Sequence, residues 1–251
     1  MKNIGVFSKD NFLYKELEEF TSDGNIILEQ IADEEEIQDI TAYDVFIVLS
    51  DFNEKLVNVI KNYNGTVLDL TGVVKNYYNN TEDIVEPSVY LLEKYFGDSL
   101  DAIKGNIYYP TCIFGKAGID DLVNQTKDIF TFGNTEPKIL KSSIPFNAIL
   151  GMGFGQNGLK EYISRFGDTI ISNFDLRLLP FSTYMIIDIF KPFNVEIYSD
   201  YLEEEIALSG ILHDRTHKIY LIDDDRVTIV ADYLKLISEQ ILEKIKFNMG
   251  E

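Results

Sequence analysis

The first half of the chain alternates between short apolar runs and stretches whose apolar residues recur at helical spacing. The strand-like runs are Ile4–Phe7, Asn25–Gln30, Val45–Ser50, Thr66–Leu70, Asn106–Tyr109 and Asp128–Phe132. Helical patterns lie between several of them, at Leu13–Phe20, Asn53–Asn62, Val89–Phe96 and Ile119–Thr126. This alternation predicts an α/β fold with a Rossmann-like, doubly wound parallel sheet.

The pattern changes from Lys138 onward. Long strand-like runs then dominate, at Asp168–Leu179, Tyr184–Phe190, His217–Ile222 and Arg226–Ala231, and only Gly158–Arg165 and Ser199–Leu208 look helical between them. We expect an α+β second domain with a mainly antiparallel sheet. The chain closes with Tyr233–Phe247, whose apolar residues recur at the spacing of an amphipathic helix.

Charge narrows the classes of partner. Acidic residues outnumber basic ones by 42 to 22, which gives a net charge of −20. Such a surface repels the phosphates of nucleic acids and anionic lipids, so we expect neither nucleic acid nor membrane as a partner. The charge fits either a plain solvated surface or a surface that binds a positively charged protein.

Length and cysteine content add two limits. With 251 residues, the chain can form one large or two small domains. No apolar run approaches the roughly 20 residues of a membrane span. A single cysteine, Cys112, allows no internal disulfide, which fits a reducing compartment. We therefore expect a cytoplasmic protein.

Five stretches match, in the right order, the motifs of one known family. "YDVFIVLSDFNEKLVNVIKNYNGTVLDLTGVVKN" resembles a strand and helix followed by V-I-D-N-S-S-x-F-R, and "IYYPTCIF" resembles I-x-N-P-N-C-S-T. "IPFNAIL" resembles I-x-F-N-x-I-P, and "FDLRLLPFSTYMIIDIF" resembles the strand that carries V-R-V-P-x-x-x-G-H. "VADYLKLISEQILEKI" resembles the family's closing helix. The chain thus resembles the aspartate-semialdehyde dehydrogenase superfamily, and within it degenerate paralogues of the enzyme.

The resemblance implies a domain layout and an oligomeric state. Residues 1–130 with 232–251 would form a Rossmann-like nucleotide-type domain, and 131–231 an α+β domain for substrate binding and dimerisation. A homodimer formed by the second domain's sheet is implied. The chain is shorter than family members, and the missing residues fall around Gly133–Ser143, where the family carries a helical dimerisation segment.

The loop that binds the NADP pyrophosphate in the family is altered. The family sequence is G-x-x-G-x-x-G, whose glycines allow a tight turn and bring backbone N–H groups to the phosphates. The three glycine positions are occupied by Ser8, Asn11 and Tyr14, and Asp10 adds a negative charge. We expect no dinucleotide to bind, so the loop would be a plain strand-to-helix turn.

Cys112 matches the family's nucleophile, which forms a thioester with the acyl group. Thr111 replaces the preceding asparagine, and Ile113 and Phe114 replace the following Ser and Thr. A lone cysteine at a strand end can also be a small buried apolar residue. We therefore interpret Cys112 as a relic nucleophile.

The base and the anion-binding positions are only partly retained. Arg177 matches the family arginine that binds the substrate carboxylate, and Lys75 matches the arginine that holds phosphate. Lysine cannot reproduce the bidentate contact of arginine. The family's catalytic histidine lies seven residues after the arginine, where this chain has Tyr184, and a phenol is a poor proton acceptor at neutral pH.

The remaining candidates carry less chemistry. The glutamine that the family has on the strand after the nucleophile is not found, and "FTFGNTEP" holds Asn134. The histidines, His213 and His217, have a spacing that could hold a metal on a helix, but the segment reads as a loop entering a strand. We expect solvated surface histidines and no metal site.

Three functions fit these residues. The first is a pseudoenzyme without cofactor that acts as a binding or scaffolding protein. The second is a divergent, active NADP-dependent semialdehyde dehydrogenase with Cys112, Arg177 and Lys75 in their family roles. The third is a sensor that binds a small anion through the two cations. The glycine-free loop favours the first.

A retired active site also predicts a packing arrangement. We expect Cys112 to lie near Arg177 at the junction of the domains, with Tyr184 in the place of the histidine. Phe12 and Tyr14 should fill the space above the first strand, because apolar surface left by a lost cofactor gains about 25 cal/mol per Å² on burial.

Overall fold

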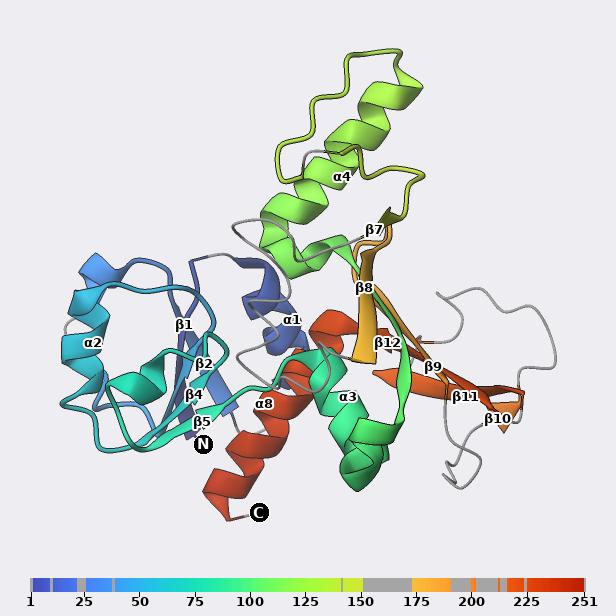
Figure 1. Ribbon diagram of the computed structural model, residues 1–251. Coiled ribbons are helices and arrows are strands. Elements are labelled where there is room, and N and C mark those ends of the chain that lie inside the picture. Colours follow the sequence, from blue (N-terminus) through green and yellow to red (C-terminus); the bar gives the residue numbers. More distant parts are fainter. Residues whose placement is uncertain are drawn as a thin grey trace. The chain divides into compact units, whose positions relative to one another are not determined.

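The computed structural model describes residues 2–9, 11–21, 26–37, 39–140, 142–150, 173–190, 200–201, 212, 216–223 and 225–250. The chain forms two compact units (Figure 1). The first comprises Met1–Val85 and Ile237–Glu251, and the second comprises Glu86–Leu236. Each unit contains one sheet.

The sheet of the first unit has five parallel strands in the order β2-β1-β3-β4-β5. The strands are β1 (Lys2–Phe7), β2 (Ile26–Ile31), β3 (Val45–Val48), β4 (Thr66–Asp69) and β5 (Thr81–Asp83). All four residues of β3 are buried, as expected for a parallel strand that is covered on both faces. The chain goes from β1 outward to β2 and then returns to the other side of β1, so β1 and β3 flank the point where the strand order reverses.

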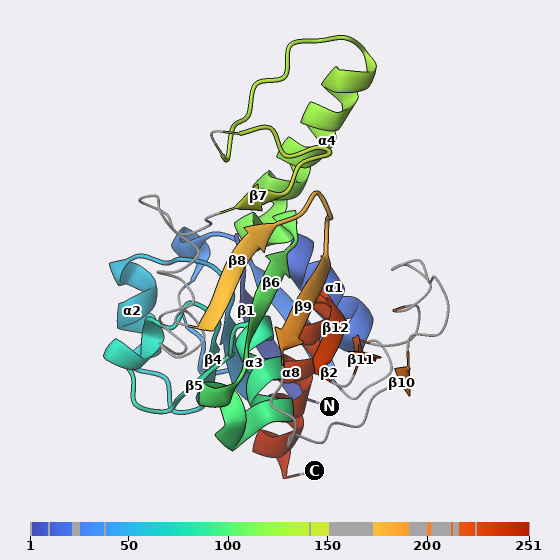
Figure 2. The same cartoon turned by 45° about the vertical axis from the view of Figure 1, so that its right-hand side comes forward.

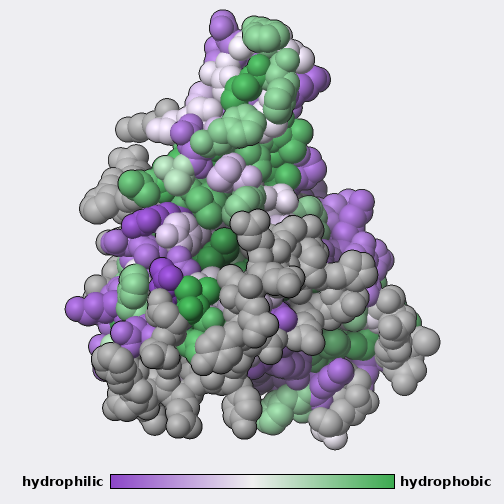
Figure 3. Space-filling model, turned by 90° about the vertical axis from the view of Figure 1, so that its right-hand side faces the viewer, coloured by the Kyte–Doolittle hydropathy of each residue, from purple (hydrophilic) through white to green (hydrophobic). Residues whose placement is uncertain are grey.

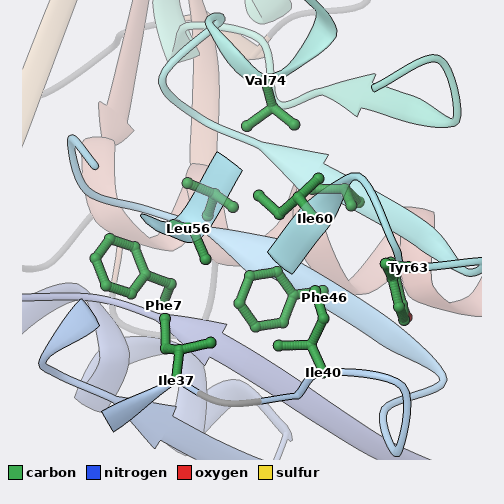
Figure 4. Close-up of a cluster of buried hydrophobic side chains, with 10 residues drawn as sticks. Phe7, Ile37, Ile40, Phe46, Leu56, Ile60, Tyr63 and Val74 are labelled. Atoms are coloured by element: carbon green, nitrogen blue, oxygen red, sulfur yellow. The ribbon is translucent and has the colours of Figure 1, made fainter. Parts of the chain in front are cut away.

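Helices and an apolar cluster complete the first unit. Its helices are α1 (Asn11–Thr21) and α2 (Glu54–Ile60), with the short 3-10 helices η1 (Glu34–Glu36) and η2 (Val74–Asn76). Asn53 caps the N-terminus of α2, where its side chain accepts a hydrogen bond from Lys55 N at 2.8 Å. The cluster joins the sheet to α2 and both short helices, and consists of Phe7, Ile37, Ile40, Phe46, Val48, Leu56, Ile60, Tyr63, Val67 and Val74 (Figure 4).

The sheet of the second unit has seven strands in the order β10-β11-β12-β9-β6-β8-β7 (Figure 2). The strands are β6 (Lys104–Tyr109), β7 (Ile149–Leu150), β8 (Phe174–Leu178), β9 (Tyr184–Phe190), β10 (Asp200–Tyr201), β11 (His217–Asp223) and β12 (Arg226–Asp232). Most neighbours are antiparallel; β6 with β8 and β10 with β11 are parallel. Burial alternates along β8 and β9, so one face of the sheet carries the core.

Capping side chains mark where two helices of the second unit begin. Among the described residues, the helices of this unit are α3 (Pro87–Phe96), η3 (Gly97–Ala102), η4 (Thr111–Phe114) and α4 (Gly115–Phe130); α8 (Tyr233–Met249) begins here and continues into the first unit. The Glu86 side chain caps α3, with Pro87 in the first turn. Asp232 caps α8 by accepting hydrogen bonds from Leu234 N and Lys235 N at 3.1 and 3.2 Å. In the described part of the chain, no helix is long and apolar enough to span a bilayer.

The predicted fold class is confirmed: a parallel sheet with helices and a mostly antiparallel second sheet. Three local predictions were wrong. Asp128–Phe132 is the end of α4 and its cap, where Thr131 N still bonds Lys127 O at 2.9 Å. Asn106–Tyr109 is a strand but belongs to the second sheet, between β8 and β9. Asp200–Tyr201, predicted helical, form β10.

Other predictions remain as they were. The predicted helix Gly158–Arg165 and the residues 202–208 lie outside the described residues. The compact units divide the chain at Val85 and Leu236. A functional division into a nucleotide-type domain of 1–130 with 232–251 and a second domain of 131–231 stays a prediction.

Candidate functional site

The loop after β1 lies where a parallel sheet of this order would bind a ligand, at the carboxyl ends of β1 and β3. Ser8, at the first glycine position, is buried, and its backbone N–H donates to Ile31 O at 3.1 Å. The Gln30 side chain donates to Ser8 O at 3.0 Å. The next backbone N–H, of Lys9, donates to Ser50 Oγ at 3.0 Å. These two amides are therefore already bonded within the protein.

A buried carboxylate lies beside the same loop. Glu34, on η1, is almost fully buried and forms an ion pair with Lys9, with 2.7 Å between Nζ and Oε1. Its other oxygen accepts a hydrogen bond from Asn53 N at 2.9 Å, the residue that caps α2. Glu34 thus joins the loop after β1 to the start of α2 and places a negative charge beside this loop. This contact could not be predicted from the sequence, because Glu34 lies within a run of acidic residues.

Asn11 and Tyr14 stand at the two other glycine positions of the loop. Asn11 is the first residue of α1, and Asp10 lies outside the described residues. Tyr14 is half-buried, and its hydroxyl donates to Leu28 O on β2 at 3.3 Å. Burial, together with the nearby carboxylates of Glu18 and Glu29, raises the pKa of Tyr14. Tyr14 therefore joins α1 to the neighbouring strand.

Lys75 lies on η2, just after β4, and is paired within the first unit. Its Nζ is 2.7 Å from Asp83 Oδ2. Buried Asp69, at the end of β4, shapes the preceding turn by accepting hydrogen bonds from the Thr71 backbone and hydroxyl and from Val74 N, all within 2.8 Å. An anion at Lys75 would have to compete with Asp83, although such a half-exposed pair contributes only about 0–1 kcal/mol.

Cys112 lies on η4 in the second unit and is buried. Its backbone N–H donates to Ser182 O at 3.0 Å, and the Thr111 N–H donates to Phe181 O at 2.8 Å. Burial raises the pKa of the Cys112 thiol well above its ordinary value, and the Asp232 carboxylate raises it further. The hydrogen bond that lowers it, from its own backbone, does not reverse the shift. The thiol is therefore held protonated at neutral pH.

Tyr184, at the predicted position of the base, serves in packing. It is the first residue of β9 and lies opposite Asp232 of β12. Its side chain packs against the apolar cluster of Leu212, Tyr220 and Val230. The hydroxyl of the preceding residue, Thr183, donates a hydrogen bond to the Asp232 carboxylate at 3.1 Å.

Arg177 lies on β8 opposite Tyr108 of β6. Its guanidinium donates to the Tyr108 hydroxyl at 3.4 Å and lies 5.5 Å from the ring centroid, a cation–π contact. Its carboxylate contact, with exposed Asp175, is long at 3.9 Å. Alternation along β8 puts Arg177 on the face opposite buried Leu176. Within the described residues, no hydrogen bond or ion pair joins Arg177 to Cys112 or Tyr184.

A buried polar cluster that could not be predicted from the sequence lies at the start of α3. One oxygen of fully buried Glu86 accepts hydrogen bonds from Ser88 N, Ser88 Oγ and Val89 N. Ser88 Oγ also lies 2.7 Å from the Tyr109 hydroxyl, and the Tyr109 and Tyr233 rings meet edge to face. Burial raises the Glu86 pKa to about 7, against the opposing hydrogen bonds from Ser88, Val89 and Tyr233. A glutamate before proline signals a helix cap, but its burial depends on tertiary packing.

The expectation of a solvated histidine was wrong for His217. It is half-buried, with Nε2 2.5 Å from the Tyr95 hydroxyl and Nδ1 2.9 Å from Thr216 Oγ1. His213 lies outside the described residues. The part of the chain that is described holds no cluster of three His, Cys, Asp or Glu side chains suited to a metal ion.

Comparison with solved structures gives full-length similarity. The chain is similar to aspartate semialdehyde dehydrogenase II from Vibrio cholerae complexed with ASA, with a TM-score of 0.75, 12% identity and coverage of 100% of this chain and 99% of that one. It is also similar to a probable aspartate-semialdehyde dehydrogenase from Pseudomonas aeruginosa, with a TM-score of 0.70, 12% identity and 98% coverage of both chains. No protein-family model and no curated sequence matches. The chain therefore has the fold of aspartate-semialdehyde dehydrogenases.

Proposed function

We propose that the chain is a semialdehyde-dehydrogenase-like pseudoenzyme that has lost NADP binding and catalysis and acts as a binding or scaffolding protein in the cytoplasm. The observation that carries this proposal is that polar groups of the loop after β1 are already bonded within the protein. Backbone amides of Ser8 and Lys9 are bonded to Ile31 and Ser50, and the Lys9 ammonium is paired with buried Glu34.

Electrostatics explains why this loop opposes a dinucleotide. A pyrophosphate carries negative charge and binds through backbone N–H groups at a helix N-terminus. Here it would meet the Glu34 carboxylate, and it would have to break internal hydrogen bonds worth about 1 kcal/mol each. Side chains at Ser8, Asn11 and Tyr14 also replace the glycines that let phosphate approach the backbone.

The catalytic positions support the same proposal. A thioester-forming cysteine must be available as a thiolate, whereas burial and Asp232 both disfavour the charged form of Cys112. The position of the base holds Tyr184, which packs against apolar side chains.

A divergent active dehydrogenase is the alternative, and two observations favour it. Cys112 lies on η4, between β6 and α4, and Arg177 keeps a guanidinium on the half-exposed face of the neighbouring strand. A small anion bound by Arg177 would fit the third function, that of a sensor.

We further propose a homodimer; the dimer through the second domain's sheet that the resemblance implies stays a prediction.

An activity assay tests the proposal. Purified protein with aspartate semialdehyde, inorganic phosphate and NADP should form no NADPH, measured by absorbance, above the level of the matched variant Cys112→Ala. The Vibrio cholerae enzyme assayed in parallel shows that the conditions support turnover. A rate that disappears in Cys112→Ala would show an active dehydrogenase instead.

A further inference from the structure

Asn64 and Gly65 lie in the loop that leads from α2 into β4 of the first unit. Asn64 is exposed, and within the described residues no hydrogen bond holds its side chain. The backbone N–H of Gly65 likewise has no hydrogen-bond partner among the residues that the structure describes. The side-chain amide of Asn64 and the backbone nitrogen of Gly65 are therefore free to react with each other.

Packing of the neighbouring tyrosines requires a glycine at position 65. A Cβ on Gly65 would collide with the Tyr63 hydroxyl. Tyr63 belongs to the apolar cluster of Figure 4, and its hydroxyl donates to Tyr43 O at 2.9 Å, so the ring cannot simply move aside. The fold thus keeps a residue without a side chain directly after an exposed asparagine.

This pair of residues permits an intramolecular reaction. Glycine has no Cβ that would keep its nitrogen away from the preceding side chain. The Gly65 nitrogen gives its proton to water or hydroxide and bonds to Asn64 Cγ, while the bond from Cγ to Nδ2 breaks and ammonia leaves. Water then opens the succinimide ring. Cleavage at Cγ yields aspartate, and cleavage at the main-chain carbonyl carbon yields isoaspartate. Water is the one co-reactant.

We propose that Asn64 is a site of spontaneous deamidation and isomerisation, at which the folded chain leaves the reaction with Gly65 open. The inference does not depend on whether the chain binds NADP. The sequence holds one other Asn-Gly pair, Asn157-Gly158, which lies outside the described residues.

Isomerisation would change the contacts that hold this loop. Gly65 O accepts hydrogen bonds from the Tyr78 hydroxyl at 2.8 Å and from Asn80 Nδ2 at 2.9 Å. Isoaspartate adds one methylene group to the main chain just before Gly65, so it displaces this carbonyl from its two donors. The isomerised protein should therefore be less stable than the unmodified one.

Peptide mapping of the full chain after incubation at slightly alkaline pH tests the proposal. Cleavage after Lys61 and Lys75 releases Asn64 in the peptide 62–75. Mass spectrometry measures the loss of the amide, and carboxyl methylation by an isoaspartyl methyltransferase distinguishes isoaspartate from aspartate. In the native protein, Asn64 should be lost as asparagine, and both products should form.

Two other asparagines serve as internal controls. Asn62 lies on the same peptide but is followed by tyrosine, and its side chain donates to Asn58 O at 3.0 Å. Asn134 is exposed but is followed by threonine. It belongs to the segment after α4, which forms part of the projection at the top of Figure 3. Both should remain asparagine while Asn64 is converted.

Variants at position 64 separate the consequences. In Asn64→Gln the side chain is one methylene longer and closes the ring more slowly, while Asn64→Asp carries the charge of the product on an unaltered main chain. Incubation should lower the stability of the wild type to urea, but not that of Asn64→Gln. Freshly prepared Asn64→Asp should be as stable as the fresh wild type.

Three results would each overturn the proposal. The first is an intact Asn64 in the native protein under conditions that convert it in the urea-unfolded chain, which would show that the fold prevents the reaction. The second is conversion of Asn62 or Asn134 at the same rate. The third is formation of aspartate without isoaspartate, which would mean direct hydrolysis of the amide.

Discussion

Cys112 in the native protein should react with iodoacetamide at pH 7.5 at least about 100-fold more slowly than in the urea-unfolded chain. The thiolate is the reactive form, and its population falls ten-fold for each unit by which the pKa rises. Burial raises the Cys112 pKa first, and the Asp232 carboxylate adds to the effect. Burial also restricts access of the reagent to the sulfur.

Mass spectrometry of quenched samples measures the labelling rate. Asp232→Asn separates the two causes: it should accelerate labelling only modestly, because burial contributes most to the shift. Rapid labelling of the folded wild type at neutral pH would mean an accessible thiolate, and the interpretation of Cys112 as a relic would then fail.

Glu86→Gln should change the pH dependence of stability by about 2.5 kcal/mol between pH 5 and pH 8. The folded pKa of Glu86 is about 7, above the ordinary value of 4.5. The folded state therefore binds the proton more tightly, and its contribution to stability is complete below the unfolded pKa. It is lost as the pH rises toward 7, by about 1.4 kcal/mol per unit. Glutamine has no proton to lose, so its variant avoids this loss.

Urea unfolding at pH 5 and pH 8 gives the two free energies for each protein. The wild type should lose stability relative to Glu86→Gln as the pH rises. Ser88→Ala is the informative companion, because Ser88 donates a hydrogen bond that stabilises the charged carboxylate. Its removal should raise the Glu86 pKa and extend the loss above pH 7. Parallel curves for the wild type and Glu86→Gln would show that Glu86 is not perturbed by burial.

The fold could be predicted because its signals are local. Apolar runs such as Val45–Val48 and the helical spacing of α8 reflect the periodicity of their own elements. Asp128–Phe132 misled the prediction because its apolar residues favour strands, while the hydrogen bonds of α4 continue through it. Sheet membership of β6 depends on distant strands, β8 and β9, and no local pattern encodes it.

The candidate site residues could be predicted from short motifs, whereas their long-range contacts could not. Ser8, Lys75, Cys112, Arg177 and Tyr184 were selected because short motifs place them. Their partners are far apart in sequence: Glu34 pairs with Lys9, and Asp232 raises the pKa of Cys112. Such contacts exist only after folding, which is why the altered loop after β1 could be recognised from its missing glycines, whereas its contacts with Glu34 and Ser50 could not.

Thermal unfolding of the wild type with increasing NADP tests the central claim most directly. A ligand present at 100 times its dissociation constant stabilises the folded state by about 2.7 kcal/mol, which corresponds to a rise of about 5 to 10 °C in Tm for a chain of this size. The Vibrio cholerae enzyme, treated identically, is the positive control. Loss of the cofactor site predicts an unchanged Tm up to millimolar NADP, while a saturable rise would contradict it.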